Sequence, residues 1–329
     1  MSESLLKVEH LKGYYRGMFG VVHGVDNVSF KMERGEIVGL AGESGCGKST
    51  LAELISGTPR PLLYYESGKV IIGEYEVYQI DAELLRTEVK CKLMSYVPQA
   101  SMESLNPVKR IIDFIMDVVR ERTKKKGSKK EIIKQASEHF SRVGLDEQVL
   151  KRYPHELSGG MKQRAVIAIS TLWNPNLLII DEPTSALDVT SQKQMIKMLS
   201  DLKKEGIIQS ILFVSHDIAS LRQLCDRCII MYCGEIVETG NMNEIINEPL
   251  HPYTQGLISS IVSFNPDGTR PAELKSIPGS QPDLRHPPPG CRFHPRCYST
   301  MTHCRTYDPP IINFPQKEGH YVKCWLYKE

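Results

Sequence analysis

The chain has 329 residues, a formal net charge of +2 and a hydrophobic content of 41%. This length predicts a core domain with an accessory region, and the near-neutral charge excludes a strong general attraction to nucleic acids or membranes. No apolar run approaches the roughly 18–20 residues that a membrane-spanning helix needs. The N-terminal sequence MSESLLKVEH also lacks the basic-then-apolar pattern of a signal peptide. We therefore expect a cytosolic protein that would act at a membrane only through separate partners.

Three zones follow one another along the chain. Residues 1–98 alternate short apolar strands with turns around one helix. Residues 100–170 carry apolar side chains at helical spacing, in RIIDFIMDVVRER and KEIIKQASEHFSRVG. Residues 171–240 return to strands, LLIID and ILFVS, separated by an amphipathic helix at about 191–204. The pattern predicts a mixed α/β core that is interrupted by a helical subdomain.

A glycine-rich loop, GESGCGKST, occupies residues 42–50 between the apolar run IVGLA and a helical pattern. A strand, a glycine loop and a helix are the context expected of a phosphate-binding G-x-x-x-x-G-K-[ST] motif. The glycines let successive backbone N–H groups face the phosphates, and the helix N-terminus adds partial positive charge. We expect Lys48 to reach the β- and γ-phosphates of ATP and Ser49 to ligate Mg²⁺. The predicted ATP contacts of this loop are Gly42, Ser44, Gly45, Cys46, Gly47, Lys48, Ser49 and Thr50.

An acidic strand end supplies the second half of a nucleotide site. The apolar residues 177–180 lead into Asp181 and Glu182, as expected of a buried parallel strand with carboxylates at its C-terminal edge. We expect Asp181 to hold the Mg²⁺ shell and Glu182 to polarise the attacking water. Because neighbouring strand residues point to opposite sides, the strand must bend to direct both toward one phosphate. Pro183 directly afterwards is consistent with such a bend.

These motifs, with YPHELSGGMKQR at residues 153–164, resemble the ATP-binding-cassette (ABC) ATPases over roughly residues 4–245. The resemblance implies a RecA-like P-loop core with an antiparallel β-subdomain and a helical signature subdomain. It also implies that two subunits close around two ATP molecules. Each ATP would then contact one phosphate loop and the opposite LSGG loop, formed by Ser158, Gly159 and Gly160.

Further residues receive roles from the same resemblance. Tyr15 matches the aromatic residue that stacks on adenine, with the neighbouring Tyr14 as the alternative. Gln99, in YVPQ, matches the glutamine that links the Mg²⁺ site to the membrane subunit. Residues 185–188 (SALD), ending in Asp188, match the segment that crosses the dimer interface, and His216 matches the residue that contacts the γ-phosphate. The set implies a catalytically competent ATPase with Glu182, His216 and Gln99 at its centre.

The sequence changes character after about residue 245. HPYTQGLISSIV is followed by the proline-rich IPGSQPDLRHPPPG and by GCRFHPRC. These elements resemble the C-terminal extension of the oligopeptide/dipeptide permease ATPases, and YPHELSGGM is more similar to their D-type subunit than to the F-type partner. We therefore divide the chain into a nucleotide-binding domain at 1–245, with its helical subdomain at about 100–170, and a loop-rich C-terminal extension at 246–329.

Four cysteines form a compact C-x5-C-x6-C-x19-C array in this extension, at Cys291, Cys297, Cys304 and Cys324. A small segment with little apolar material usually needs a staple, and in a reducing cytosol a metal is more plausible than disulfides. Four thiolates are the ligand set of a [4Fe–4S] cluster, and the array resembles the cluster-binding tail of some D-type subunits. Zn²⁺ is the main alternative, although its four-cysteine sites usually contain paired C-x2–4-C knuckles.

Together the motifs predict the ATP-hydrolysing subunit of a multi-subunit importer at the cytoplasmic face of the cell membrane. The resemblance implies an F-type ATPase and two transmembrane permease subunits as partners, with an extracellular solute-binding protein acting indirectly and no nucleic acid. Peptides are the expected solute, with oligosaccharides or nickel as alternatives within the same family. A soluble ABC ATPase of DNA repair, translation or iron–sulfur assembly is the remaining alternative. It is disfavoured because the chain has one cassette and no long coiled-coil insert.

Overall fold

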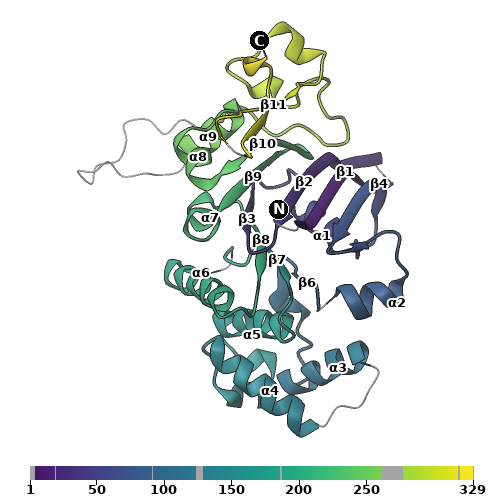
Figure 1. The fold of residues 1–329 in the computed structure, drawn as a ribbon, viewed down its shortest axis with the longest axis vertical. Helices are drawn as coiled ribbons and strands as arrows, with labels where there is room; N and C mark the ends of the chain where they lie inside the picture. Colours follow the sequence, from purple (N-terminus) through teal and green to yellow (C-terminus); the bar gives the residue numbers. More distant parts are fainter. Residues whose placement is uncertain are drawn as a thin grey trace, which may run out of the picture. The chain divides into compact units, whose positions relative to one another are not determined.

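The computed structural model describes residues 4–18, 20–90, 92–123, 129–185, 187–260, 277–317 and 319–328 (Figure 1). The described chain forms two compact units. The first contains residues 1–6, 32–36 and 71–212, and the second contains residues 7–31, 37–70 and 213–329. No helix among the described residues combines the length and apolar character needed to span a bilayer. Ala186, within the SALD segment, lies outside the described residues.

The first unit contains the acidic strand in its predicted place. Strand β7 (Leu177–Asp181) is buried along its whole length and pairs in parallel with β6 (Met94–Val97). Next to it, the backbone N–H of Ser210 at the start of β8 (Ser210–Val214) donates to the carbonyl of Asn176 over 2.8 Å. β5 (Tyr75–Glu76) pairs antiparallel with the end of β4 (Leu63–Ile72). The buried parallel pair places the carboxylates of Asp181 and Glu182 at its C-terminal edge.

Helices make up most of the remaining first unit. The two helices expected from apolar spacing are confirmed as α3 (Ile111–Thr123) and α4 (Lys129–Arg142), and they lie beside α5 (Gly159–Thr171) in Figure 1. The side chain of Ser158 caps the start of α5 by accepting from the backbone N–H of Met161 over 3.3 Å. The signature loop therefore lies at a helix N-terminus. The helices of this unit are α2 (Ala82–Leu84), α3 (Ile111–Thr123), α4 (Lys129–Arg142), α5 (Gly159–Thr171) and α6 (Val189–Lys204).

A buried polar contact holds α5 against α4. Nε2 of His139 lies 2.9 Å from the hydroxyl of Thr171, which itself donates to the carbonyl of Ile167 over 2.7 Å. His139 is 6% exposed, and burial lowers its pKa to about 4, with a smaller contribution from the charge of Arg142. The folded subdomain therefore contains a neutral imidazole at physiological pH.

This histidine predicts a loss of stability in mild acid. The unfolded chain binds a proton at His139 below its ordinary pKa of about 6.5, whereas the folded chain does so only near pH 4. The free energy of unfolding should therefore fall as the pH drops through this window, by up to about 3 kcal/mol from this one group. Urea unfolding at pH 7.5 and pH 5 should show a smaller difference for His139→Gln than for wild type, whereas the exposed His286→Gln should behave as wild type. An unchanged difference in His139→Gln would exclude this assignment.

The second unit is built around a mixed sheet with the strand order β11-β12-β10-β9-β3. β3 (Ile37–Ala41) runs parallel to β9 (Arg227–Tyr232), and β9 pairs antiparallel with β10 (Glu235–Asn241). Strands β1 (Ser4–Gly17) and β2 (Gly20–Glu33) lie mostly in this unit, next to β4 in the order β2-β1-β4. Its helices are α1 (Lys48–Ile55), α7 (Ile218–Leu224), α8 (Met242–Asn247) and α9 (Pro252–Ser259).

The C-terminal extension contributes strands to this sheet. We expected a loop-rich segment, and most of it does consist of turns and short 3₁₀ helices, but β12 (Tyr321–Lys323) pairs antiparallel with β10. β11 (Ile311–Asn313) adds one more strand outside it (Figure 1). Val322 is completely buried, and Nε2 of His320 lies 2.9 Å from the buried carboxylate of Glu238. Burial of these few side chains accounts for the pairing.

Candidate functional site

The phosphate loop lies between β3 and α1 in the second unit. Gly47 caps α1 with a φ of 107°, and an added Cβ there would lie 2.1 Å from the carbonyl oxygen of Gly24. Gly42 has a φ of 150°, and an added Cβ would lie 2.3 Å from the carbonyl oxygen of Met231. Any other residue at these two positions would clash with backbone as well as adopt an unfavourable torsion angle. The sequence thus forms a tight loop that exposes N–H groups at a helix N-terminus.

Lys48 is buried within this loop at 4% exposure. Its Nζ donates to the carbonyl of Gly42 over 2.8 Å and to that of Glu43 over 3.0 Å. Cys46 is also buried, and burial raises the pKa of its thiol although the charge of Lys48 opposes the effect. An ammonium ion held by loop carbonyls is positioned to exchange them for phosphate oxygens.

The structure distinguishes the two candidate adenine contacts. The hydroxyl of Tyr15 lies 3.1 Å from that of Thr50, so Tyr15 is adjacent to the phosphate loop. The hydroxyl of Tyr14 instead donates to Asp26 over 2.9 Å, and its ring packs on His23. Of the two tyrosines, Tyr15 is therefore the one whose hydroxyl contacts a residue of the phosphate loop. His216 is exposed in the turn that follows β8, in the same unit.

In the first unit, Gln99 and Glu182 are brought together. Nε2 of Gln99 donates to Oε2 of Glu182 over 3.3 Å. The backbone at Glu182 has a φ of 47°, which is uncommon for a residue other than glycine. This is the bend expected after Asp181, whose side chain is 2% exposed. A strained backbone at a predicted catalytic carboxylate fits the general clustering of such strain at functional sites.

The LSGG loop and the end of the SALD segment share one pocket of about 340 Å³ in the first unit. Asp188 caps α6, since its carboxylate accepts from the N–H groups of Thr190 and Ser191 at 3.0 Å and from the Ser191 hydroxyl at 2.7 Å. The Ser191 hydrogen bonds are the main reason that the pKa of Asp188 is lowered. The predicted site residues in this pocket are Ser158, Gly159, Gly160 and Asp188.

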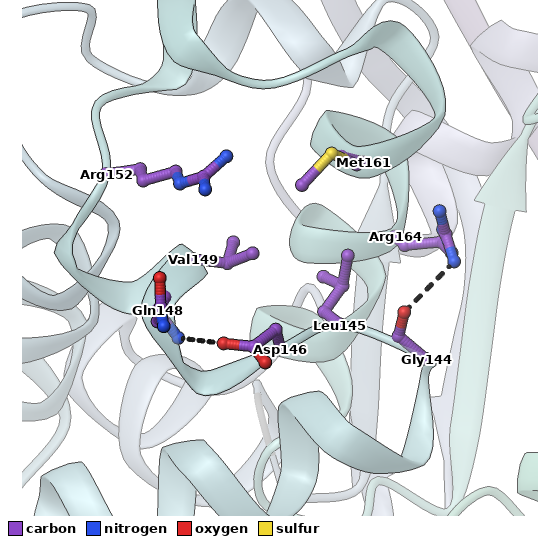
Figure 2. A pocket seen from close by; sticks show the side chains of 8 residues that line it. All are labelled: Gly144, Leu145, Asp146, Gln148, Val149, Arg152, Met161 and Arg164. Carbon is purple, nitrogen blue, oxygen red and sulfur yellow. Dashed lines mark hydrogen bonds between the residues drawn. The ribbon is translucent and has the colours of Figure 1, made fainter.

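Arg164 is a residue of this region to which the sequence analysis assigned no role. Its Nε donates to the carbonyl of Gly160 over 3.3 Å, and its Nη1 donates to that of Gly144 over 3.2 Å. Figure 2 shows it at the edge of a second pocket, of about 420 Å³, where Met161 and Arg152 project from other parts of the lining. Arg164 lines both pockets. Its position one helical turn after Gly160 was the available signal.

The predicted site residues therefore fall into two sets. The second unit holds Tyr15, the phosphate loop and His216, and the first unit holds Gln99, Asp181, Glu182, the LSGG loop and Asp188. Within the first unit, Asp181 and Gln99 offer carboxylate and amide oxygens of the kind that suits Mg²⁺.

The four cysteines of the extension line a single pocket. Burial, with smaller contributions from neighbouring thiols, raises the pKa of Cys291 to about 12 and that of Cys324 to about 11. The backbone N–H groups of Phe293, Ser299 and Leu326 partly oppose this rise in pKa at Cys291, Cys297 and Cys324, respectively. Within the described part of the chain, however, no three His, Cys, Asp or Glu side chains come together as ligands of a metal ion.

Comparison with known proteins agrees with this geometry. Residues 25–185 match the ABC transporter family, and residues 237–304 match the C-terminal region of the oligopeptide/dipeptide transporters. The ATP-binding cassette MJ0796, solved as a dimer in a post-hydrolysis state with ADP and phosphate, is 25% identical with a TM-score of 0.64. The match covers 72% of this chain and 98% of that one. The fold and the phosphate loop define an ABC-type ATPase.

The similarity to curated proteins extends over nearly the whole chain. The dipeptide transport ATP-binding protein DppD of Caldanaerobacter subterraneus subsp. tengcongensis is 40% identical, across 99% of this chain and 98% of the relative. The oligopeptide transport ATP-binding protein AppD of Bacillus subtilis is also 40% identical, with the same coverage. This chain belongs to the family of ATP-binding subunits of oligopeptide and dipeptide ABC transporters.

Proposed function

We propose that this chain hydrolyses ATP to power the import of peptides through a membrane transporter. The observation that carries the proposal is the phosphate loop of the second unit, in a chain whose relatives, similar over nearly their full length, are named for dipeptide and oligopeptide transport. The direct test is uptake of a labelled peptide by proteoliposomes that contain the complete transporter. ATP-dependent uptake that is lost in Lys48→Ala supports the proposal. Uptake of another solute class but not of peptides would contradict the assignment of the solute.

We propose that the functional unit contains two ATPase subunits, this D-type chain and an F-type partner. Each ATP would be bound by Lys48 and Ser49 of one subunit and by the LSGG loop of the other. The exposed Ser158 and Gly159, next to a pocket within the same unit, support this arrangement. Two Bacillus subtilis relatives, AppD and AppF, are 40% and 36% identical to this chain, which supports pairing between related subunits. Mg²⁺ held by Ser49, Asp181 and Gln99 would supply charge neutralisation at the phosphates.

Contact with two permease subunits, at the cytoplasmic face of the membrane, is proposed for the helical subdomain near Gln99. Arg164 supports a mechanical link, because it binds the carbonyl of Gly160 and also lines the pocket of Figure 2. A movement of the signature loop would therefore be transmitted to that pocket. An extracellular solute-binding protein would deliver the peptide to the permease subunits.

We further propose that Cys291, Cys297, Cys304 and Cys324 hold a [4Fe–4S] cluster. Their shared pocket and the backbone N–H groups that oppose the rise in pKa at three of the cysteines fit thiolate ligands, since hydrogen bonds from such groups stabilise cluster thiolates. The raised pKa values of Cys291 and Cys324 mean that ligation would release protons. A single zinc ion, with Zn–S bonds of about 2.3 Å, needs its four sulfurs closer together than a cluster does. The spacers of five and six residues, longer than those of the usual paired zinc knuckles, favour the larger group.

The cluster can be tested by metal analysis of anaerobically purified protein. We expect a brown protein with about four irons per chain. Cys297→Ser should lose most of this iron, because the half-buried Cys297 would no longer offer a thiolate. Cys225→Ala, which changes a buried core cysteine outside the pocket, should keep it. Colourless protein with one zinc per chain would overturn the cluster, and full iron content in Cys297→Ser would overturn the ligand set.

A further inference from the structure

Glu43, the second residue of the phosphate loop, is held by the C-terminal extension. Its carboxylate accepts two hydrogen bonds from Arg296, Nη1 to Oε2 over 2.7 Å and Nη2 to Oε1 over 3.0 Å. Gln281 donates to Oε2 over 2.9 Å, and the backbone N–H of Glu43 donates to the hydroxyl of Tyr253 over 2.8 Å. A two-point arginine–carboxylate pair fixes both position and orientation. The loop is therefore tied to residues more than 200 positions later in the chain.

Arg296 is itself rigidly placed. Its side chain is 5% exposed, its Nε donates to the carbonyl of Pro278 over 2.8 Å, and its Nη1 also reaches the hydroxyl of Tyr232 at 3.3 Å. It ends the 3₁₀ turn His294–Arg296 and directly precedes Cys297. Phe293, on the other side of that turn, lines the cysteine pocket and packs its ring against those of Tyr232 and Tyr253. The cysteine pocket and Glu43 are thus joined by a continuous set of packed side chains.

A second arginine of the same segment holds the other side of the loop. Arg292 pairs with Asp26 at 2.5 Å and with Glu235 at 3.2 Å, and it donates to the carbonyl of Cys233 over 2.6 Å. The next residue, Gly234, donates its N–H to the carbonyl of Cys46 over 2.8 Å. The turn that supports the phosphate loop is therefore also held by the extension.

The pairing of Glu43 with Arg296 matters for phosphate binding because Glu43 and the phosphates both carry negative charge. Burial alone would raise the pKa of this carboxyl, but hydrogen bonds from Arg296 and Gln281 and the charges of Arg296 and Lys48 lower it overall. Glu43 is therefore ionised, in a loop built to bind an anion. An unpaired carboxylate at this position would repel the phosphates of ATP.

We propose that Arg296 is a positioning residue for ATP binding, which holds the carboxylate of Glu43 and neutralises its charge within the phosphate loop. The cysteine-bearing extension is accordingly part of the machinery that sets ATP affinity, rather than an appendage to it. This inference rests on the proposed binding of ATP by residues 42–50.

The test measures the dissociation constant of a fluorescent ATP analogue for the full-length chain. Arg296→Gln should raise this constant roughly tenfold, which corresponds to a repulsion of about 1.4 kcal/mol between the unpaired Glu43 carboxylate and the phosphates. Glu43→Gln should bind at least as tightly as wild type, because it removes the repelling charge. The double variant Glu43→Gln/Arg296→Gln should return to within about threefold of wild type, since neither charge remains unpaired.

Control variants distinguish a specific effect of Arg296 on ATP affinity from a general disruption of the C-terminal extension. Arg285→Gln, which removes an exposed arginine of the same segment, should bind ATP as wild type does, and thermal unfolding together with iron content would report any disruption of the extension. Wild-type affinity in Arg296→Gln would overturn the inference. A double variant as weak as Arg296→Gln would also overturn it, because the loss would then stem from a disordered extension. If Lys48→Ala binds ATP as tightly as wild type, the proposed ATP site itself is wrong and the inference falls with it.

Discussion

Glu182→Gln is expected to slow ATP hydrolysis by about 10²–10⁴-fold, the range attributed to a positioned general base. The amide of glutamine cannot accept a proton from the attacking water. It can still accept the hydrogen bond that Gln99 donates to Oε2 over 3.3 Å in the wild type. ATP binding should therefore be retained, and the variant should accumulate as a closed, ATP-bound assembly. Steady-state phosphate release and nucleotide retention by the reconstituted transporter measure the two effects.

The matched control for this substitution is Glu205→Gln, at the C-terminal end of α6. It makes the same chemical change away from the proposed site, so its turnover should equal that of wild type. Near-normal hydrolysis in Glu182→Gln would remove Glu182 from the catalytic role. Loss of ATP binding together with hydrolysis would instead indicate that the substitution had altered the end of β7.

Gly160→Asp should act on the partner subunit's ATP site and leave this chain's own fold intact. An added Cβ at Gly160 meets no atom within 4 Å, and a carboxylate in the first turn of α5 is favourable to the helix. In the closed dimer the new carboxylate would meet the γ-phosphate. We expect hydrolysis at that site to fall by about 10²-fold, comparable to the loss of one preorganised donor at a transition state.

The experiment pairs Gly160→Asp of this chain with a wild-type partner and measures hydrolysis at each site separately. A partner variant lacking its phosphate-loop lysine isolates the site built on Lys48 of this chain, which should be unaffected. Gly17→Asp, at another position with open space, should leave both sites active. Full transporter-level hydrolysis by this chain alone, without dimerisation, would contradict the shared-site arrangement.

Features determined by nearby residues could be predicted from the sequence. The phosphate loop is specified within ten residues, since the left-handed backbone at Gly47 and the steric limit at Gly42 leave few alternatives. The bend at Glu182 followed from the need to turn two successive side chains toward one phosphate, and its φ of 47° confirms it. The helices α3 and α4 followed from apolar periodicity.

Features that depend on residues far apart in the sequence could not be predicted in this way. Strand β12, which pairs with β10, has only three residues and lies in a segment rich in turns. Three residues are too few for an alternation of apolar and polar side chains to be recognised in the sequence. The pair between Glu43 and Arg296 joins two charges that are unremarkable in their own segments. The contact between the hydroxyls of Tyr15 and Thr50 depends on the position of Thr50, which the sequence does not place relative to either tyrosine ring.

The order of the strands has a consequence for biosynthesis. On the ribosome β10 emerges well before β12, because the whole cysteine-bearing segment lies between them in the sequence. The nascent protein therefore carries a sheet with one open edge, and open edges invite pairing with other chains. A nascent chain in which residues 291–324 fail to fold would keep that edge exposed. The folding of this segment would then determine how long β10 stays available for pairing with other chains.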